Sequence, residues 1–352
     1  MASLSKGFAV AQRLLDWFDH HGRKSLPWQQ DISPYRVWVS EIMLQQTQVQ
    51  TVIPYYERFM QALPSVQQLA AATEDAVLHL WTGLGYYSRA RNLQRTARIV
   101  SEQFGGEFPD DVESLCELPG IGRSTAGAIV SIAFRKRAAI LDGNVKRVLA
   151  RLHAVDGYPG ESAVAKTLWE HAERHTPGER VADYTQAIMD LGATLCTRTR
   201  PACGVCPLMD GCIAFQSGRQ PEFPGRKASK VLPVKRTQML IISSPEGDVL
   251  LEKRPPSGIW SGLWIFPQID QALDPVVHCA DTLRLDVQLH ERWAQYRHTF
   301  SHYHLDIEPV RLTVRSLATA VMEADRHLWY NLRAPAAVGL AAPVAKLLQK
   351  LA

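Results

Sequence analysis

Apolar residues recur at helical spacing through most of the segment from residue 7 to residue 215. Near the N-terminus, Phe8, Leu14 and Phe18 share one face of a predicted helix, and polar residues take the other face. The pair Ser33–Pro34 is typical of a helix start. Apolar stripes also continue along residues 35–59, and further helices are predicted at residues 74–82, 88–104, 123–135, 144–154, 161–175 and 180–194.

The pattern changes after residues 217–235, which are rich in proline, glycine and basic side chains and have the composition of a linker. Beyond them, β-branched and aromatic residues cluster with partial alternation, which predicts strands. The predicted strands are Gln238–Ser243, Val249–Lys253, Trp293–Ile307 and Val310–Val314, and a closing helix is predicted at Val344–Leu351. Residues 236–352 are therefore expected to form a smaller α+β domain.

Composition places the chain among ordinary globular proteins. Its 352 residues are 46% apolar and 21% charged, which excludes collagen, bulk disorder and a disulfide-rich miniprotein. No apolar run approaches the roughly 18–20 residues that a membrane-spanning helix needs, and the N-terminal segment lacks the apolar stretch of a secretory signal. We therefore expect a cytoplasmic protein without membrane contact, whose six cysteines are ligands or buried thiols.

The positive charge is concentrated in one segment. Six of the 39 basic residues, but only one of the 35 acidic residues, lie between Arg219 and Arg236. This local excess is larger than the net charge of +4, so the remaining sequence is close to neutral. The basic segment suits a path across phosphates, although a solubilising tether has the same composition.

Four of the six cysteines crowd together with the spacing C-x6-C-x2-C-x5-C. They are Cys196, Cys203, Cys206 and Cys212. Zinc sites usually combine two short C-x2-C knuckles, and this segment has only one. A single cubane with four cysteine ligands is the better match, with zinc or unligated thiols as alternatives. The isolated Cys116 and Cys279 are expected to be buried as small apolar side chains.

A glycine turn precedes the predicted helix at 123–135. Residues 118–125 read LPGIGRST, and Gly120 and Gly122 let the backbone approach a phosphate. The following helix N-terminus offers unpaired N–H groups and the positive end of a helix dipole. The pattern indicates a phosphate-binding turn, although a plain corner between two helices is the alternative.

Several motifs in one order resemble the endonuclease III class of helix-hairpin-helix base-excision DNA glycosylases. They are LPGIGR, then ILDGNVKR about twenty residues later, and then the four-cysteine segment. The segments SEIMLQQTQV, GLGYYSRARNL and LDGNVKRVLARL, together with a separate C-terminal domain, are similar to the MutY-type adenine DNA glycosylases within that class. The resemblance extends over nearly the whole chain, from about residue 8 to residue 348.

This resemblance implies a multidomain fold, in which an all-α helix-hairpin-helix glycosylase domain with an iron–sulfur cluster is followed by an α+β Nudix-like domain. The implied cofactor is a [4Fe-4S] cluster held by the four clustered cysteines. Three regions are implied: a helical glycosylase region at 1–216, a basic linker at 217–235 and a Nudix-like 8-oxoguanine recognition domain at 236–352. Within the helical region, a six-helix barrel is expected at about 30–136, and a cluster domain is expected from 1–29 together with 137–216.

Two carboxyl groups are candidates for cleaving an N-glycosidic bond. Adenine leaves poorly as an anion and needs a proton, and the sugar cation needs a negative charge. On a helix, Glu41 has mainly apolar neighbours, which suits a general acid with a raised pKa; a plain helix-edge glutamate is the alternative. Asp142 precedes a predicted helix, which it can also cap. The resemblance implies that Glu41 is the acid, that Asp142 stabilises or captures the sugar cation, and that Asn144 helps to position Asp142.

Ser124 bears on whether the enzyme also nicks the strand. Endonuclease III-type lyases carry a lysine at this position, because an amine forms a Schiff base with the opened sugar. A hydroxyl cannot form one, so Ser124 predicts a monofunctional glycosylase.

A glycosylase must extrude its base and fill the gap that the base leaves. The resemblance implies that Gln46 and Tyr86 are inserted near the opposite base, where an amide can bridge base edges and a phenol ring can stack. Core packing is the alternative for Tyr86. The resemblance also implies that Gln186 contacts the flipped adenine and that Arg23, Trp28 and Gln45 line the same pocket.

The C-terminal domain resembles a Nudix fold through its strand pattern and the segment RPPSGIWSGLWIFPQ. The residues that follow lack the acidic REUXEE box that holds metal in Nudix hydrolases, so pyrophosphatase activity is not expected. Phe300, Ser301 and His302 match the F-S-H loop by which the family senses 8-oxoguanine. A metal site of His298, His302 and His304 is a weaker alternative to a polar strand face.

The implied activity is excision of adenine mispaired with 8-oxoguanine or guanine in double-stranded DNA, by a monomer associated with a bacterial-type nucleoid. Three alternatives remain: an endonuclease III-like pyrimidine glycosylase and lyase, a Nudix pyrophosphatase, and a DNA-binding protein without activity. Ser124 and the extra domain disfavour the first, the missing acidic box disfavours the second, and the presence of both Glu41 and Asp142 disfavours the third.

Overall fold

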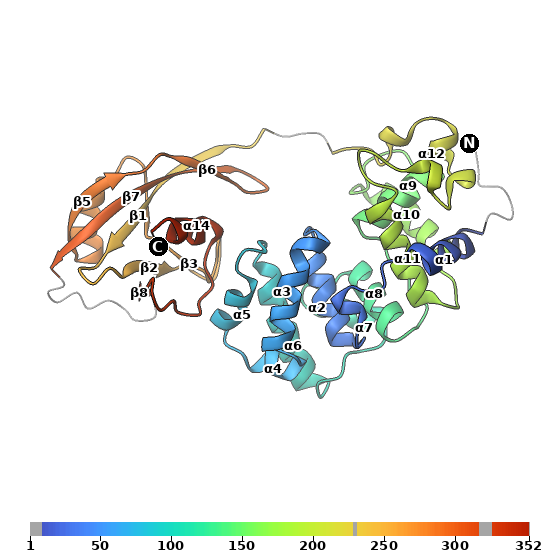
Figure 1. Ribbon diagram of the computed structural model, residues 1–352, viewed down its shortest axis with the longest axis horizontal. Coiled ribbons are helices and arrows are strands. Elements are labelled where there is room, and N and C mark those ends of the chain that lie inside the picture. Colours follow the sequence, from blue (N-terminus) through green and yellow to red (C-terminus); the bar gives the residue numbers. More distant parts are fainter. Residues whose placement is uncertain (1–8, 228–230, 317–325, 352) are drawn as a thin grey trace. The chain divides into compact units, whose positions relative to one another are not determined.

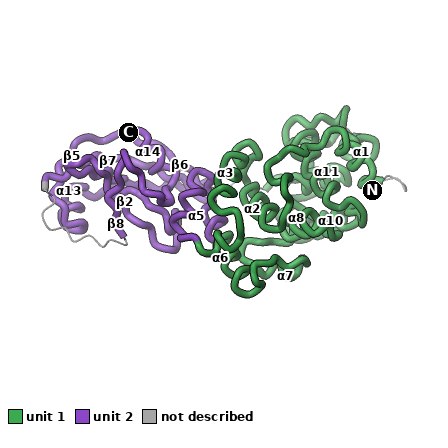
Figure 2. The backbone as a smooth tube through the Cα atoms, turned by 60° about the horizontal axis from the view of Figure 1, so that its bottom comes forward, with its two compact units in different colours: residues 1–71, 92–229 green, residues 72–91, 230–352 purple. Residues whose placement is uncertain are grey.

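The computed structural model describes residues 9–227, 231–316 and 326–351, so Phe8 of the first predicted helix lies outside it. The chain divides into two units (Figure 2). The first, here called the helical unit, comprises residues 1–71 and 92–229. The second, called the strand unit, comprises residues 72–91 and 230–352.

The helical unit is built from α-helices joined by short turns (Figure 1). Its α-helices are α1 (Val10–His21), α2 (Pro34–Leu44), α3 (Val49–Ala62), α4 (Val66–Ala71), α7 (Val112–Cys116), α8 (Arg123–Ala133), α9 (Gly143–His153), α10 (Ser162–His175), α11 (Val181–Thr194) and α12 (Ile213–Gln216). Four 3-10 turns accompany them: η1 (Pro27–Gln29), η2 (Cys203–Val205), η3 (Met209–Gly211) and η4 (Gln220–Glu222). Helix α6 (Ser88–Gln103) continues from the strand unit into this unit.

Local sequence explains where α2 begins and ends. The Ser33 side chain accepts a hydrogen bond from the backbone N–H of Arg36, and Pro34 occupies the first turn, as the sequence predicts. The apolar pattern of residues 35–59 is interrupted in the structure, because the chain leaves α2 after Leu44 and Gln46 adopts a left-handed backbone with φ 60°. The interruption places the side chains on either side of residue 46 on two separate helices.

Close packing among five helices forms the centre of the helical unit. Helix α2 packs on α8, and α11 packs on α1, α8 and α9. Gly192 of α11 permits the approach of α9, because a Cβ atom there would lie 2.6 Å from the Cβ of Asn144. This contact fixes the N-terminal turn of α9 against α11.

The strand unit contains one eight-stranded sheet with helices beside it (Figure 1). Its strands are β1 (Val234–Ser243), β2 (Val249–Lys253), β3 (Trp264–Ile265), β4 (Gln268–Ile269), β5 (Asp286–Arg292), β6 (Tyr296–Thr299), β7 (His304–Ser316) and β8 (His327–Tyr330). Its helices are α5 (Glu74–Trp81), α13 (Pro275–His278), the π-helical turn η5 (Cys279–Leu283) and α14 (Ala342–Leu351).

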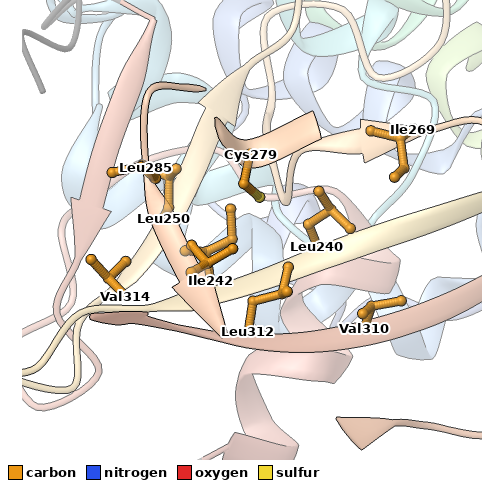
Figure 3. Packing of buried hydrophobic residues seen from close by; sticks show 10 residues of the cluster. Leu240, Ile242, Leu250, Ile269, Cys279, Leu285, Val310, Leu312 and Val314 are labelled. Atoms are coloured by element: carbon orange, nitrogen blue, oxygen red, sulfur yellow. The ribbon is translucent and has the colours of Figure 1, made fainter. Parts of the chain in front are cut away.

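The sheet has the order β3-β2-β1-β7-β5, with β4 on β1, β6 on β7 and β8 on β2. Only β1 and β7 pair in parallel among the described strands; the register aligns Val234 with His304. Buried aliphatic side chains from β1, β2, β5 and β7 pack with Cys279 in one core (Figure 3). The burial of Cys279 confirms the prediction for this residue, whereas the prediction for Cys116 is wrong, because Cys116 ends α7 and is exposed.

Residues 72–91 belong to the strand unit, although the sequence analysis included them in the six-helix barrel. Asp75 of α5 accepts a hydrogen bond from Lys253 Nζ at 2.9 Å and another from the indole N–H of Trp264 at 3.3 Å. The Tyr87 hydroxyl donates to the carbonyl of Leu340 at 2.9 Å. These contacts join α5 and the turn after it to strands that come much later in the sequence.

The first half of the predicted linker is folded onto the helical unit. Phe223 is buried, and the N–H of Gly225 donates to the carbonyl of Gly157 at 3.0 Å. Arg219 pairs with Glu222, with 2.7 Å between the charged atoms. Arg226 and Lys227 are exposed, and residues 228–230 lie outside the described part of the chain.

Candidate active site and iron–sulfur centre

Glu41 lies in the last two turns of α2, among buried neighbours such as Trp38, Ile42 and Met43. Burial raises the pKa of Glu41 to about 8, with a smaller contribution to this rise from the nearby carboxylate of Asp142. At neutral pH the carboxyl group therefore carries a proton and can donate it.

Asp142 is the N-cap of α9, as its position before the helix predicted. Its carboxylate accepts a hydrogen bond from the backbone N–H of Val145 at 2.7 Å. Burial raises the pKa of Asp142 above its usual range, while backbone N–H groups of Asn144 and Val145 and the cations of Arg147 and Lys146 oppose the rise. The N-terminus of α9 thus supplies groups that favour the ionised form of Asp142, while Glu41 is protonated.

Ser124, in the first turn of α8, is tied to the segment that carries Asp142. Its hydroxyl oxygen accepts a hydrogen bond from the backbone N–H of Leu141 at 3.0 Å. The neighbouring Thr125 accepts a weaker bond from the Gln45 side-chain amide at 3.4 Å. Ser124 and Thr125 at the N-terminus of α8 therefore connect the glycine turn with the residue before Asp142 and with Gln45, which follows the helix that carries Glu41.

The glycine turn joins α7 to α8. Gly120 has a φ of +81°, and a Cβ atom there would lie 2.9 Å from the Cβ of Asn92, so the turn requires glycine at this position. Gly122 caps α8, and a Cβ atom there would meet open space, so packing does not explain this glycine. The open position before the α8 N-terminus leaves room for a phosphate.

Asn144 and Arg147 link α9 to α11 and to the cysteine segment. Arg147 donates to the Asn144 side chain at 2.8 Å, to the Gly192 carbonyl at 2.7 Å and to the Cys196 carbonyl at 2.7 Å. The Asn144 side chain is thus held by Arg147, and its backbone N–H faces Asp142. Asn144 and Arg147 stabilise the turn that presents the carboxylate.

Two of the predicted pocket residues, Arg23 and Gln186, are linked through Gln29 of η1, and Trp28 lies next to Gln29 in the same turn. The Arg23 guanidinium and backbone N–H donate to the buried Asp190 carboxylate at 2.6–2.9 Å. Trp28 is buried and packs edge-on against Tyr56, with ring centroids 5.5 Å apart. Arg23 is therefore occupied by an ion pair with a buried carboxylate, and Trp28 is packed in the interior.

Gln29 is a pocket residue that the sequence analysis missed. Its amide nitrogen donates to the Gln186 side-chain oxygen at 3.3 Å and to the Arg23 carbonyl at 2.8 Å, and its oxygen accepts from the N–H of Leu26 at 3.1 Å. This amide holds Gln186 in place. The only sequence signal was its position next to Trp28.

Gln46 and Tyr86, which the resemblance places near the opposite base, share one backbone feature. Both are exposed and have left-handed backbones, with φ of 60° and 48°. This conformation costs about 1 kcal/mol or more in residues other than glycine, so surrounding structure must hold it. At Tyr86, buried Arg89 donates to the carbonyls of Leu84 and Gly85 at 3.2 Å each, and its guanidinium lies 5.5 Å from the Tyr86 ring.

The four clustered cysteines line one pocket with Arg151 and apolar side chains such as Leu195 and Phe215. Arg151 is 3% exposed. It donates to Cys196 Sγ at 3.4 Å and to the carbonyls of Thr197, Arg198 and Phe223 at 2.7–3.1 Å. Convergent thiols beside a buried cation fit an anionic cluster with cysteine ligands. Sequence reasoning missed Arg151 because a basic residue inside an amphipathic helix has no distinctive local pattern.

Phe300, Ser301 and His302 form the turn between β6 and β7. The Phe300 ring packs against Trp260, His298 and Tyr303 with centroids 4.6–5.3 Å apart. Ser301 and His302 are exposed, and the Ser301 hydroxyl lies 3.4 Å from His302 Nδ1. Phe300 therefore anchors the turn, and its two polar neighbours face the solvent.

Comparisons with known proteins agree with this arrangement. Residues 39–174 match the HhH-GPD superfamily base excision DNA repair protein model, residues 196–212 match the iron–sulfur binding domain of endonuclease III, and residues 238–350 match the NUDIX domain. Similar proteins include the adenine DNA glycosylase of Buchnera aphidicola subsp. Acyrthosiphon pisum (strain APS), which is 37% identical with 97% of each chain covered. The adenine DNA glycosylase of Homo sapiens is 38% identical over 83% of this chain and 64% of its own.

Among solved structures, a thermostable thymine-DNA glycosylase is 27% identical with a TM-score of 0.52, covering 59% of this chain and 95% of its own. Endonuclease III in a non-covalent DNA complex shares the fold, with 23% identity and a TM-score of 0.51 over 59% of this chain and 94% of its own. Both the cluster and the two-part fold predicted from the sequence are confirmed by these matches. None of the helices in the described residues has the length and apolar character needed to cross a membrane.

Proposed function

Because the chain belongs to the adenine DNA glycosylase family, we propose that it hydrolyses the N-glycosidic bond of adenine mispaired with 8-oxoguanine or guanine in double-stranded DNA. It is a DNA glycosylase of base excision repair, and its substrate is DNA. The observation that carries the proposal is the buried Glu41 carboxyl with a pKa of about 8, set beside Asp142.

Glu41 acts as the general acid. Its proton passes from the carboxyl oxygen to a ring nitrogen of adenine as the bond to the sugar breaks, so that adenine leaves as a neutral base. Burial keeps the proton on the carboxyl at neutral pH, and the low local dielectric strengthens its interaction with the base. Gln186, held by Gln29, orients the extruded adenine by hydrogen bonding to its edge.

Asp142 stabilises the positive charge that develops on the sugar. The N-terminal turn of α9 favours its carboxylate form through N–H groups and nearby cations. Water then adds to the sugar carbon and releases a proton, which restores the carboxyl group of Glu41, and the products are free adenine and an abasic site. Ser124 supplies no amine for a Schiff base, so the phosphodiester strand is left intact.

The four thiols that would hold the iron–sulfur cluster belong to a segment that contacts α9 through Arg147 and Arg151. When bound, the cluster supplies four iron–thiolate bonds that fix the cysteine segment. Arg151 stabilises its negative charge and holds the backbone from Thr197 to Phe223. Helix α9 thereby connects the cluster with Asp142 at its other end.

The strand unit recognises the base opposite adenine. Ser301 and His302 offer exposed donors and acceptors at the β6–β7 turn, which suits hydrogen bonding to oxidised guanine. Gln46 and Tyr86 fill the gap left by the extruded nucleotide, and Arg226 and Lys227 contact phosphates. We further infer that a monomer acts, and that the predicted domain limits hold apart from residues 72–91, which group with the strand unit.

A strand-cleavage assay tests the proposal. Duplexes that contain A:8-oxoG, A:G or thymine glycol are incubated with the protein under single-turnover conditions and analysed with and without alkali. We expect alkali-dependent cleavage of the adenine strand in the first two duplexes and none in the third. Cleavage at thymine glycol without alkali identifies a pyrimidine glycosylase and lyase, and intact strands in all duplexes contradict the proposed activity.

A further inference from the structure

Three histidines converge between α9 and α10, and none belongs to the candidate active site. His153 ends α9, and His171 and His175 lie one turn apart on α10, so both face the same side of that helix. One ring nitrogen from each histidine can be chosen so that all three lie within 4.8 Å of one another. All three side chains are half-buried.

The three rings contact one another closely. His153 Nε2 lies 2.8 Å from His175 Nε2, which is a hydrogen bond between two imidazoles. The rings of His153 and His171 stack with centroids 3.6 Å apart and an interplanar angle of 8°. Among the described residues, no hydrogen-bond partner faces the buried Nδ1 of His171. The group therefore holds more ring nitrogens than its internal hydrogen bond can satisfy.

The protonation state of these rings suits metal ligands. Burial lowers the pKa of His153 to about 3 and that of His175 to about 4, and it also lowers the pKa of His171. The Arg174 cation acts in the same direction on all three, whereas Glu170 opposes it at His171. Arg174 is exposed, so its charge is solvated. Neutral imidazole is the form that binds a metal.

We propose that His153, His171 and His175 form a binding site for one divalent d-block cation, with zinc as the representative ion. Imidazole ligands favour zinc, nickel, cobalt and copper over magnesium and calcium. Two zinc–nitrogen bonds of about 2.0–2.1 Å place tetrahedral ligand atoms roughly 3.3 Å apart, which is within the spread of the present nitrogens. The stacked His171 ring has to turn about its side-chain bonds to aim a nitrogen at the ion, and water completes the coordination.

The site would fasten the end of α9 to α10. The other end of α9 carries Asp142, and its middle and last turns contact the cysteine segment through Arg147 and Arg151. A bound cation would thus stabilise the helix that connects the candidate active site with the cluster. This inference is independent of the substrate of the enzyme.

Zinc binding to the full-length, cluster-loaded protein tests the proposal. Equilibrium dialysis with elemental analysis of zinc and iron is expected to give one zinc per chain with unchanged iron. His171→Gln and His175→Gln should each weaken zinc binding by more than about tenfold, since even loss of an outer-shell partner costs ~10–100-fold. A double variant, His20→Gln with His21→Gln, removes two exposed histidines of α1 and serves as the matched control. Zinc should raise the melting temperature of the wild type and the control, but not of His171→Gln.

X-ray absorption at the zinc edge identifies the ligands without interference from iron. A shell of nitrogen atoms with imidazole scattering is the expected result. A sulfur shell means that zinc has entered the four-cysteine site, and it overturns the proposal. Absence of stoichiometric zinc, or equal binding by the wild type and both single variants, overturns it as well and leaves a hydrogen-bonded histidine stack. If His171→Gln does not fold, His175→Gln at the helix end decides between these outcomes.

Discussion

In the helical unit, Glu41 and Asp142 are half-buried, at the end of α2 and at the cap of α9, and burial raises the pKa of both carboxyls. In the strand unit, Ser301 and His302 lie exposed on a turn, and only Phe300 is anchored. Burial changes the proton affinity of a carboxyl by several pKa units, whereas an exposed hydrogen-bonding group keeps its ordinary properties. Substitutions in the first region should therefore change the rate strongly, and those in the second should change selectivity modestly.

The largest effect is expected for Glu41→Gln. The amide preserves the size of the side chain but has no carboxyl proton to transfer, so single-turnover adenine release should fall by about 10²–10⁴ or more. Duplex affinity, measured by gel shift on the same A:8-oxoG substrate, should change little. Excision at a near-normal rate would remove Glu41 from the mechanism.

The pH dependence should follow the two carboxyls. With a pKa of about 8, Glu41 is protonated below pH 8 and ionised above it, so the excision rate should fall by about tenfold per pH unit above this value. Because burial raises the pKa of Asp142, its loss of charge at acid pH should lower the rate on the acid side, at a higher pH than for an exposed aspartate. Single-turnover rates at saturating enzyme provide the measurement. A rate that stays constant from pH 7 to pH 10 contradicts the assignment of the acid.

Ser124→Lys tests whether the turn is placed as the fold implies. The amine should gain weak strand nicking without alkali and become trapped on DNA by borohydride. Loss of the hydroxyl also removes the hydrogen bond to the N–H of Leu141, so adenine release should slow by several-fold.

Ser124→Ala is the matched control, because it loses the same hydrogen bond without gaining an amine. Slower release in both variants with trapping only in Ser124→Lys is the expected result. A folded, active Ser124→Lys protein that is not trapped would show that residue 124 does not face the sugar.

The smallest effect is expected in the strand unit. Replacing Ser301 and His302 by alanine should reduce the preference for A:8-oxoG over A:G by several-fold, since each exposed hydrogen bond contributes about 0.5–1.5 kcal/mol. The ratio of single-turnover rates on the two duplexes measures this preference. Equal losses on both substrates would mean that the turn does not read the opposite base.

Local pattern was sufficient for much of the fold. The start of α2 at Ser33–Pro34 and the bounds of β2 at Val249–Lys253 follow from capping and alternation over a few residues, and the structure confirms both. The four cysteines were also readable, because their short spacing keeps the thiols near one another in almost any compact conformation. Such features depend on neighbours in the chain.

Features that depend on contacts between residues far apart in the sequence could not be predicted from the sequence. The sequence indicated a buried Glu41, yet the contribution of Asp142 to its pKa arises from a residue 101 positions later. Gln29 gained its role from contact with Gln186, which depends on how η1 lies beside α11, and Arg151 gained its role from contact with Cys196, which depends on the packing of α9 on α11.

The exposed Cys116 and the His153–His171–His175 group show the same limit. A helix pattern places His171 beside His175, but the position of His153 and the exposure of Cys116 depend on how each helix end meets the rest of the unit. The amino-acid sequence by itself determined most of the helices, some of the strands, the cysteine spacing and the chemical types available. Tertiary structure decided which of these groups are desolvated together, because proton affinity and metal binding depend on the distances between side chains from separate elements.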